Sequence, residues 1–365
     1  MSIARIGMIG AGTMGAGIAT NAAQNGIDVL LTDQSLDLAE KAKAGAAKFY
    51  ARQQEKGRMS EGEVADALAR IKPVAELSDL APADLIIEAI FEDFDIKADL
   101  FKKLQNIRRD DALVATNTSC LRVSDLQEHD RLPERFLGMH YFSPAQVNPI
   151  VEVVEGAKTD PSITDSTIEF CERTKKQPIR CKDSFGFAIN RFFCPYTNEA
   201  AKALDAGLGT PNQIDAVAKD CLGAAAGPFQ VMNLIKPRIN LHAIRNLGPL
   251  GQFYAPAASM TKMGEADASW ELDDAPALDS ASAAKIADML RCGAFLPVLQ
   301  ALDENVANPG AFDLGARQAL KISRAPCALM DELGQAEVER IIAPVLAQYG
   351  IEKPRSVAKI GQLTA

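Results

Sequence analysis

The sequence has few histidines, no excess of basic charge and no long apolar segment. It contains 3 histidines, His129, His140 and His242, and no two of them have the spacing of zinc ligands. We therefore expect no metal site. The formal net charge is −9 and there is no basic block, which argues against nucleic acid and anionic membranes as partners. No apolar run reaches the roughly eighteen residues of a membrane-spanning helix, so we expect no membrane partner.

The sequence also lacks an export signal and paired cysteines. The first residues lead directly into an apolar strand, without the basic and apolar regions of a secretory signal. The 7 cysteines are scattered without CxxC spacing, which indicates reduced thiols. We therefore expect a cytoplasmic protein. Its 365 residues, 47% of them hydrophobic and 24% charged, are typical of a globular chain of two or three domains.

The first half of the chain alternates between predicted strands and helices. Residues 14–25 have helical spacing, and residues 36–70 are mostly helical with one break at 56–58. Alternation of this kind favours an α/β fold with a doubly wound, parallel, Rossmann-type sheet. The predicted strands are residues 3–9, 28–32, 85–90, 113–116 and 136–139.

Helical, alanine-rich sequence dominates the second half, and part of it repeats. Asp215, Ala218, Leu222, Pro228 and Met232 recur 98 residues later as Asp313, Ala316, Leu320, Pro326 and Met330, and Asn233 matches Asp331. We predict an all-α region built from a duplicated module, while residues 246–274 are rich in loops. The predicted domains are 1–184 (α/β), 185–282 (helical module) and 283–365 (second, degenerate helical module).

A glycine-rich turn lies between the first predicted strand and the first predicted helix. Its three glycines would permit a tight turn, close approach to a pyrophosphate, and helix–strand packing. Asp33 ends the next strand, where it would bind a ribose hydroxyl and repel a 2′-phosphate, and Gln34 follows instead of arginine. NAD is therefore favoured over NADP, although a plain glycine turn remains an alternative. The turn consists of Gly10, Ala11, Gly12, Thr13, Met14 and Gly15.

A histidine and a glutamate stand in apolar strand sequence twelve residues apart. His140 follows the strand at 136–139, and Glu152 interrupts the apolar run 150–154. A buried charge needs a partner. An imidazole oriented by a carboxylate is a suitable base near neutral pH. The alternatives are a core histidine with satisfied hydrogen bonds and a glutamate facing solvent.

Three further polar groups are candidates for ligand binding. Asn117 and Ser119 follow the strand at 113–116, where ligands bind to doubly wound sheets, although a helix cap is equally compatible. Arg52 and Lys56 belong to a basic cluster that is either an anion site or a solvated helix face. Asn190 opens the helical half, where it caps a helix or meets a substrate.

Together these segments resemble the L-3-hydroxyacyl-CoA dehydrogenases over about residues 1–235. The resemblance implies an NAD-binding Rossmann domain, a helical domain, and NAD-dependent oxidation of a 3-hydroxyacyl-CoA, a step of fatty-acid β-oxidation. The matching segments are RIGMIGAGTMGAGIA, IIEAIFEDFDIKADLF, ATNTSCLRVSDL, GMHYFSPAQVNPIVEVVEG and DSFGFAINRFFCPYTNEA…GTPNQIDAVAKDCLGAAAGPF.

The resemblance also implies roles for individual residues. His140 would be the base and Glu152 its orienting carboxylate, and Ser143 stands where the family usually has asparagine. Residues 232–237 depart from the family pattern, so the sequence does not determine the acyl chain of the substrate. The implied contacts are Ser119 and Asn190 for the reacting oxygen, Glu92 and Lys97 for NAD, with Asn117, Ser119 and Ser143 in the same cofactor site, and Arg52 and Lys56 for the CoA phosphates.

The second helical copy has Leu290 where the first has Asn190, so it is interpreted as structural. In single-module relatives the helical domain commonly forms the dimer contact. The chain is therefore expected to be a monomer with an internal pseudo-dimer, or a homodimer.

Two other functions are weighed against the dehydrogenase. A dehydrogenase of a free hydroxy acid, of the sugar-acid or carnitine type, is disfavoured by Tyr141 after the histidine. A non-catalytic NAD- or CoA-binding protein is disfavoured by the intact candidate residues.

Overall fold

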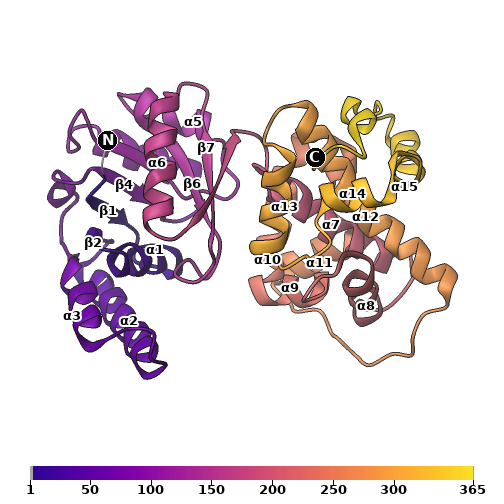
Figure 1. The fold of residues 1–365 in the computed structure, drawn as a ribbon, viewed down its shortest axis with the longest axis horizontal. Coiled ribbons are helices and arrows are strands. Elements are labelled where there is room, and N and C mark those ends of the chain that lie inside the picture. The colour runs from indigo at the N-terminus through magenta and orange to yellow at the C-terminus, as the bar shows by residue number, and fades with distance from the viewer. Residues whose placement is uncertain (1–2, 365) are drawn as a thin grey trace. The chain divides into compact units, whose positions relative to one another are not determined.

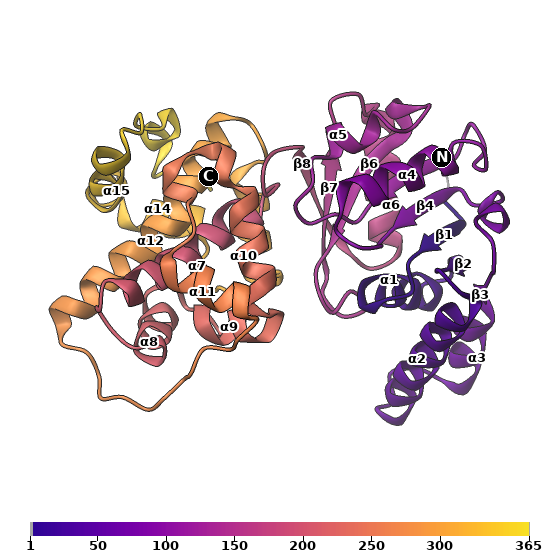
Figure 2. The same ribbon diagram turned by 180° about the vertical axis from the view of Figure 1, so that it is seen from behind.

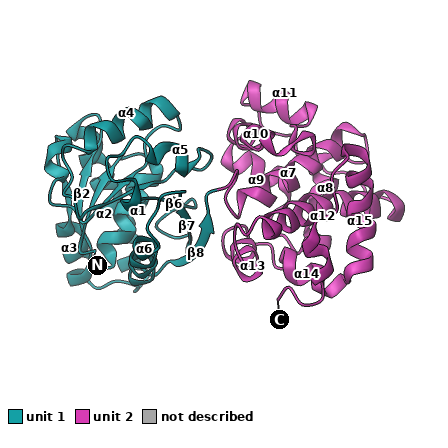
Figure 3. Ribbon diagram, turned by 90° about the horizontal axis from the view of Figure 1, so that it is seen from above, with its two compact units in different colours: residues 1–183 teal, residues 184–365 magenta. Residues whose placement is uncertain are grey.

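The chain folds into two compact units, with the boundary between Asp183 and Ser184 (Figure 3). The computed structural model describes residues 3–364. The first unit is an α/β unit and the second is all-helical, as the sequence predicts. Within the described residues, no helix has the length and apolarity needed to cross a membrane.

The first unit is built on an eight-stranded sheet with the order β3-β2-β1-β4-β5-β6-β7-β8. The neighbours from β3 to β6 pair in parallel, and the strand order reverses at β1. Such a reversal is where doubly wound sheets bind ligands, outside the carboxyl ends of the strands. The strands are β1 (Arg5–Ile9), β2 (Asp28–Thr32), β3 (Ile71–Pro73), β4 (Leu85–Glu88), β5 (Leu113–Thr116), β6 (Phe136–Tyr141), β7 (Ile150–Glu155) and β8 (Gln177–Lys182).

One strand pair differs from the predicted all-parallel sheet. β7 runs antiparallel to β6, and β8 is again parallel to β7. Residues 142–149 connect β6 to β7. A parallel pairing needs a crossover of about a dozen residues or more, so this short connection produces a hairpin instead. The hairpin places residues of β6 directly opposite residues of β7.

Helices cover both faces of the sheet (Figures 1 and 2). α1 (Thr13–Gln24) and α6 (Pro161–Arg173) contribute Ile18 and Phe170 to one core. On the other face, α4 (Phe94–Leu104) places the ring of Phe101 edge-on against Phe136, with centroids 4.8 Å apart. The short helix α5 (Val123–Gln127) packs beside it against β6. The sheet is therefore buried on both faces, which explains its nearly continuous apolar strands.

Two helices form an arm that extends from the sheet (Figures 1 and 2). α2 (Leu36–Glu55) and α3 (Glu61–Arg70) pack against each other. The turn between them contains Gly57 with φ +67°, and α3 begins with a capping box formed by Ser60 and Glu63. The helix break predicted at residues 56–58 is therefore confirmed.

The second unit is centred on two long helices that pack along each other. α7 (Asn190–Asp205) and α12 (Ser280–Asp303) approach so closely that a Cβ on Gly293 would lie 2.9 Å from the Cα of Tyr196. The stretch predicted as loop contains two short 3-10 helices and one α-helix, α11 (Ala258–Ala266), which packs against the preceding helix α10. The remaining helices are α8 (Pro211–Leu222), α9 (Pro228–Ile235), α10 (Pro237–Asn246), α13 (Pro309–Gln318), α14 (Pro326–Leu333) and α15 (Gln335–Tyr349).

The repeat in the sequence corresponds to a repeated set of hydrogen bonds. Asp215 of α8 accepts from the N–H groups of Phe229 (2.8 Å) and Gln230 (3.0 Å) at the start of α9. Asp313 of α13 accepts from Cys327 (2.8 Å) and Ala328 (3.0 Å) at the start of α14. A carboxylate here satisfies two N–H groups that a helix leaves without internal partners. Both copies therefore join their helix pairs in the same way.

One position of the repeat carries different residues in the same rare backbone conformation. Gly334 begins α15 with φ 81° and ψ 159°, and Lys236, 98 residues earlier, begins α10 with φ 82° and ψ 132°. This region is natural for glycine and strained for a residue with a Cβ. A Cβ on Gly334 would have no heavy atom within 4 Å, so the conformation alone favours glycine there.

We expect Lys236→Gly to stabilise the protein by about 1 kcal/mol, because strain relief exceeds the added entropy of the unfolded chain. The matched variant Gly334→Ala should destabilise it by about the same amount. The midpoint of urea unfolding measures both changes. A lower midpoint for Lys236→Gly would contradict the assignment of strain to this residue.

Candidate active site

The three glycines of the turn after β1 meet three different requirements. Gly10 has φ +101°, and a Cβ there would lie 2.4 Å from the carbonyl oxygen of Ala89. A Cβ on Gly15 would lie 1.8 Å from the carbonyl oxygen of Gly10. A Cβ on Gly12 would meet no heavy atom within 4 Å of the described chain, yet this residue begins α1. Gly12 thus leaves open space at a helix N-terminus, which suits a pyrophosphate.

Asp33 lies beside this turn, at the end of β2. Its carboxylate accepts hydrogen bonds from the N–H groups of Ala11 (2.5 Å) and Gln34 (2.6 Å). The sheet therefore brings Asp33 to the glycine turn across 22 residues of sequence. A partly exposed carboxylate here can also accept from the hydroxyls of a ribose.

The predicted histidine–glutamate pair is formed by the β6–β7 hairpin. His140 lies directly opposite Glu152 in the antiparallel register, and its Nδ1 is 2.6 Å from Glu152 Oε2. Both residues are buried, with Glu152 at 0% exposure. Leu137 and Met139 face the core beneath α1 and α6, so the alternation of the strand turns His140 to the opposite face. Because a carboxylate can only accept, Nδ1 carries the hydrogen when the ring is neutral, and Nε2 is the basic nitrogen.

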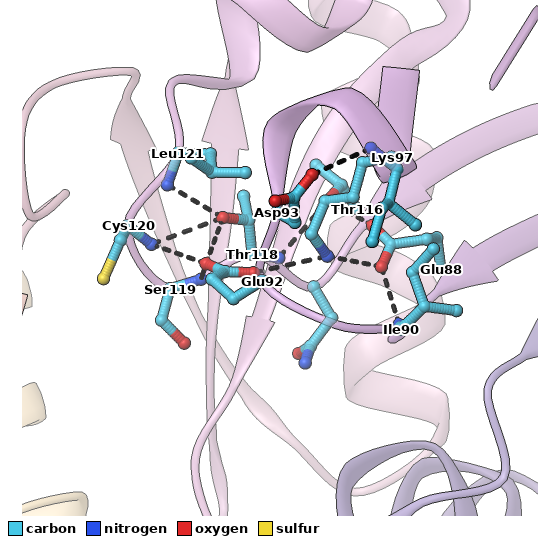
Figure 4. A network of polar contacts seen from close by, with 12 residues as sticks. Glu88, Ile90, Glu92, Asp93, Lys97, Thr116, Thr118, Ser119, Cys120 and Leu121 are labelled. Atoms are coloured by element: carbon cyan, nitrogen blue, oxygen red, sulfur yellow. Dashed lines mark hydrogen bonds and ion pairs between the residues drawn. The ribbon is translucent and has the colours of Figure 1, made fainter. Parts of the chain in front are cut away.

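A second ionic cluster lies at the ends of β4 and β5 (Figure 4). Lys97 of α4 places its Nζ 2.5 Å from Glu88 Oε1 and 3.3 Å from Glu92 Oε2. The second oxygen of Glu88 accepts from the hydroxyl of Thr116 at 2.7 Å, and the first also accepts from the N–H group of Ile90. The side chains of Lys97 and Glu88 are 1% and 0% exposed. We call the set Glu88, Lys97 and Glu92 the carboxylate–lysine cluster.

The carboxylate–lysine cluster is bonded to the loop after β5, which carries Ser119. Glu92 Oε1 accepts from Thr118 Oγ1 (2.5 Å) and from the N–H groups of Ser119 (2.7 Å) and Cys120 (3.0 Å). Burial would raise the pKa of Glu92, but the Lys97 ammonium and these three donors outweigh it and hold that pKa below its usual range. The ionised carboxylate therefore stabilises the fold at neutral pH, and this contribution is lost as the pH falls through the lowered pKa.

Glu88 is a further site residue that the sequence signals but that was not predicted. Glu88 stands within the apolar run 85–90, just as Glu152 stands within its strand. Both carboxylates are completely buried, and each contacts one nitrogen-bearing side chain, Lys97 for Glu88 and His140 for Glu152. The requirement that a buried charge has a partner identifies both residues equally well.

The remaining candidates lie in several places. Asn117 joins neighbouring strands, because its side chain accepts from the N–H group of Tyr141 at 2.9 Å. Ser143 is exposed on the connection after β6. Arg52 and Lys56 are exposed one helical turn apart at the end of α2, in the arm. Asn190 begins α7 of the second unit, beside Arg191, whose buried guanidinium pairs with Glu304 at 2.5 Å. The roles of these residues stay predictions.

Comparison with protein families matches both units. Residues 5–184 match the family described as 3-hydroxyacyl-CoA dehydrogenase, NAD binding domain. Residues 186–285 match the family described as 3-hydroxyacyl-CoA dehydrogenase, C-terminal domain. The first match contains the glycine turn, the carboxylate–lysine cluster and the histidine–glutamate pair, so the glycine turn is part of an NAD-binding domain.

Individual relatives agree with these matches. A 3-hydroxyadipyl-CoA dehydrogenase of Escherichia coli K12 is 35% identical over 240 residues, which are 66% of this chain and 50% of that enzyme. This chain thus spans half the length of that relative. A solved (S)-3-hydroxybutyryl-CoA dehydrogenase from Ralstonia eutropha is 32% identical, with a TM-score of 0.71, and the match covers 74% of this chain and all of that one. A 3-hydroxybutyryl-CoA dehydrogenase structure from Escherichia coli K12 has a TM-score of 0.89 over 98% of both chains at 23% identity, which shows a shared fold.

We expect Asp33 to make NAD the preferred cofactor by at least about ten-fold in kcat/KM, because its charge repels the 2′-phosphate of NADP. Asp33→Asn is the matched variant, since it keeps an acceptor beside Ala11 and removes the charge. The ratio of kcat/KM for NAD to that for NADP should fall in this variant. An equal ratio in the two proteins would show that Asp33 does not determine the choice.

Proposed function

This chain belongs to the 3-hydroxyacyl-CoA dehydrogenase family of NAD-dependent oxidoreductases, and we propose that it oxidises (3S)-3-hydroxyacyl-CoA thioesters to 3-oxoacyl-CoA. We assign the proton transfer to His140 and Glu152. The observation that carries this assignment is the 2.6 Å contact between His140 Nδ1 and the buried carboxylate of Glu152. The glycine turn and Asp33 in the same unit supply the cofactor site.

In the proposed reaction the O–H bond of the 3-hydroxyl group and the C–H bond at carbon 3 of the substrate both break. The hydroxyl proton passes to His140 Nε2, and NAD held at the glycine turn and Asp33 would supply the acceptor for the hydride from carbon 3. Glu152 holds the ring with Nε2 available and stabilises the imidazolium that forms. We assign to Ser119 and Asn190 the hydrogen bonds to the substrate oxygen as its charge develops.

We expect His140→Ala to lower kcat by about 10²- to 10⁴-fold while NAD still binds, because the base is lost and the glycine turn is untouched. Glu152→Gln keeps the shape of the pair and should lower kcat by less. NADH formation from 3-hydroxyacyl-CoA measures kcat, and titration of cofactor fluorescence measures NAD binding. Since His140→Ala leaves a buried carboxylate alone, His140→Gln provides a control that retains a donor for Glu152. A near-native kcat in both histidine variants would refute the mechanism.

We propose that the exposed end of α2 binds the phosphates of CoA. Arg52 and Lys56 lie four residues apart, so both side chains share one face of the helix. This basic face favours a CoA thioester over a free hydroxy acid as substrate. A non-catalytic binding protein is disfavoured because the histidine–glutamate pair is intact.

Replacing both Arg52 and Lys56 with alanine should raise KM for the thioester several-fold and leave KM for NAD unchanged. The difference should shrink at high salt, because salt screens exposed charges. The double variant Lys102→Ala/Lys103→Ala removes the same charge from exposed positions of α4 and should leave both constants unchanged. An equal thioester KM in all three proteins would mean that the α2 end is an ordinary solvated surface.

We propose an assembly state from the duplicated helical module. The contact of α12 with α7 lies within one chain, which supports a monomer with an internal pseudo-dimer, with a homodimer as the alternative. The acyl group is to be identified with a panel of thioesters that includes short-chain and dicarboxylic members, since the relatives carry names of both types. A cytoplasmic location stays a prediction from the sequence.

A further inference from the structure

Lys176 is a buried lysine that the proposed proton transfer does not use. It lies between α6 and β8, and it is 5% exposed. Its Nζ donates to two backbone carbonyls, those of Ala145 at 2.6 Å and Asn148 at 2.7 Å. Within the described residues 3–364, no carboxylate forms an ion pair with this ammonium. A buried charge without a counter-ion is unfavourable, so the two carbonyl dipoles are its main stabilising partners.

The fold keeps the charge of Lys176 at a cost in stability. Burial lowers the pKa of Lys176 to about 8, and the neighbouring Cys171 of α6 only partly opposes this shift. A lowered pKa means that the fold disfavours the ammonium relative to the unfolded chain. An apolar side chain of the same length would avoid that cost. The two carbonyls that bind the ammonium therefore indicate what this residue contributes.

Both carbonyls belong to the segment that joins the two strands of the histidine–glutamate pair. We call residues 142–149 the β6–β7 connection. His140 lies shortly before this connection and Glu152 shortly after it. The ring of Phe142, its first residue, packs against the ring of His140 with centroids 4.5 Å apart. A movement of the connection would therefore act directly on the imidazole.

The segment that carries Lys176 is itself fixed to α1. The carbonyl of Thr174 accepts from the side-chain amides of Asn21 and Asn25, both at 3.2 Å. These two asparagines lie at the end of α1, the helix that begins at the glycine turn. The ammonium thus reaches the β6–β7 connection from a backbone that is bonded to this helix.

The β6–β7 connection is also packed closely against α1. A Cβ on Gly17 of α1 would lie 2.7 Å from Gln146 Oε1 and 3.1 Å from the Cβ of Ala145. Ala145 therefore faces α1 with its side chain and binds Lys176 with its carbonyl oxygen. The connection has little room to shift while both contacts are in place.

We propose that Lys176 is a positioning residue for the reaction, and that it holds the β6–β7 connection so that Phe142 keeps its place against the imidazole of His140. This inference rests on the proposed function, because it takes His140 as the base. Without the two bonds from Lys176 the connection shifts, and the imidazole loses a neighbour that limits its tilt. The glycine turn and Asp33 are untouched, so the proton transfer is misaligned while the cofactor still binds.

Three variants of the full chain test this assignment. Lys176→Met keeps the length of the side chain and removes its charge and its donors. Lys176→Arg keeps a charge and donors at the same position. Lys175→Met makes the same change at the neighbouring exposed position and is the matched control.

Two kinds of measurement are compared across these proteins. The first is steady-state kinetics with 3-hydroxybutyryl-CoA, together with the Kd of NAD. The second is hydrogen exchange of the amides of Val147 and Asn148, which donate to the carbonyl of Pro144 at 2.9 and 2.8 Å within the connection. Exchange of these amides reports opening of the connection whether or not the protein turns over a substrate.

We expect Lys176→Met to lower kcat by about 10- to 100-fold, the effect of a misplaced group, with KM for the thioester and the Kd of NAD changed by less than about three-fold. The amides of Val147 and Asn148 should exchange at least about ten-fold faster in this variant. Lys176→Arg should retain most of the kcat and the slow exchange, and Lys175→Met should behave as the unmodified protein.

Three results would overturn the proposal. They are a near-native kcat in Lys176→Met, a lowered kcat with unchanged exchange, and an arginine variant as slow as the methionine variant. The unmodified protein provides a check that holds even if Lys176→Met fails to fold. Its Val147 amide should exchange as slowly as the amides of β7, although the Val147 side chain is 64% exposed. Exchange as fast as that of an unbonded amide would also contradict the proposal.

The exchange result separates this inference from the proposed reaction. If the unmodified protein forms no NADH from any thioester, the proposed function fails, and exchange in Lys176→Met still shows whether Lys176 holds the connection. If the unmodified protein is active and the exchange rates are equal in all four proteins, Lys176 does not hold the connection and the inference fails alone.

Discussion

The candidate chemistry of this protein depends on the direction of its strands. β1, β2, β4, β5 and β6 run in parallel, so their carboxyl ends lie at one edge of the sheet. The glycine turn, Asp33, the carboxylate–lysine cluster, Ser119 and His140 all follow or end these strands. Helix packing on both faces buries the strands and leaves this edge as the place where polar groups meet a ligand.

Buried charge is the second constraint, and the unit meets it twice in different ways. Glu152 faces an imidazole, because His140 Nδ1 lies 2.6 Å from its carboxylate. Glu88 and Glu92 share one partner, because the Nζ of Lys97 lies 2.5 Å from Glu88 and 3.3 Å from Glu92. The first arrangement suits proton transfer, and the second matches two carboxylates with one ammonium.

The sequence allowed much of this site to be predicted. The GxGxxG turn and Asp33 have fixed spacing within one strand–helix–strand unit, so their local geometry follows from the local sequence. The duplicated helical module was visible because Asp215 and Asp313 make the same bonds in both copies. Glu92 and Lys97 were named as site residues from the sequence, but Glu88 was not, and its contacts with Lys97 and Thr116 join separate elements that spacing in the sequence does not connect.

The elements and the residue types of the site can be predicted from local sequence, because periodicity, glycine positions and turn residues act over a few residues. Which of these residues meet depends on packing in three dimensions. The short connection between β6 and β7 forces a hairpin, and its register sets His140 opposite Glu152, where a shift by one residue would turn the two side chains to opposite faces. Register and burial arise from packing between distant segments. That packing determines whether a polar residue in a strand contacts another residue of the site.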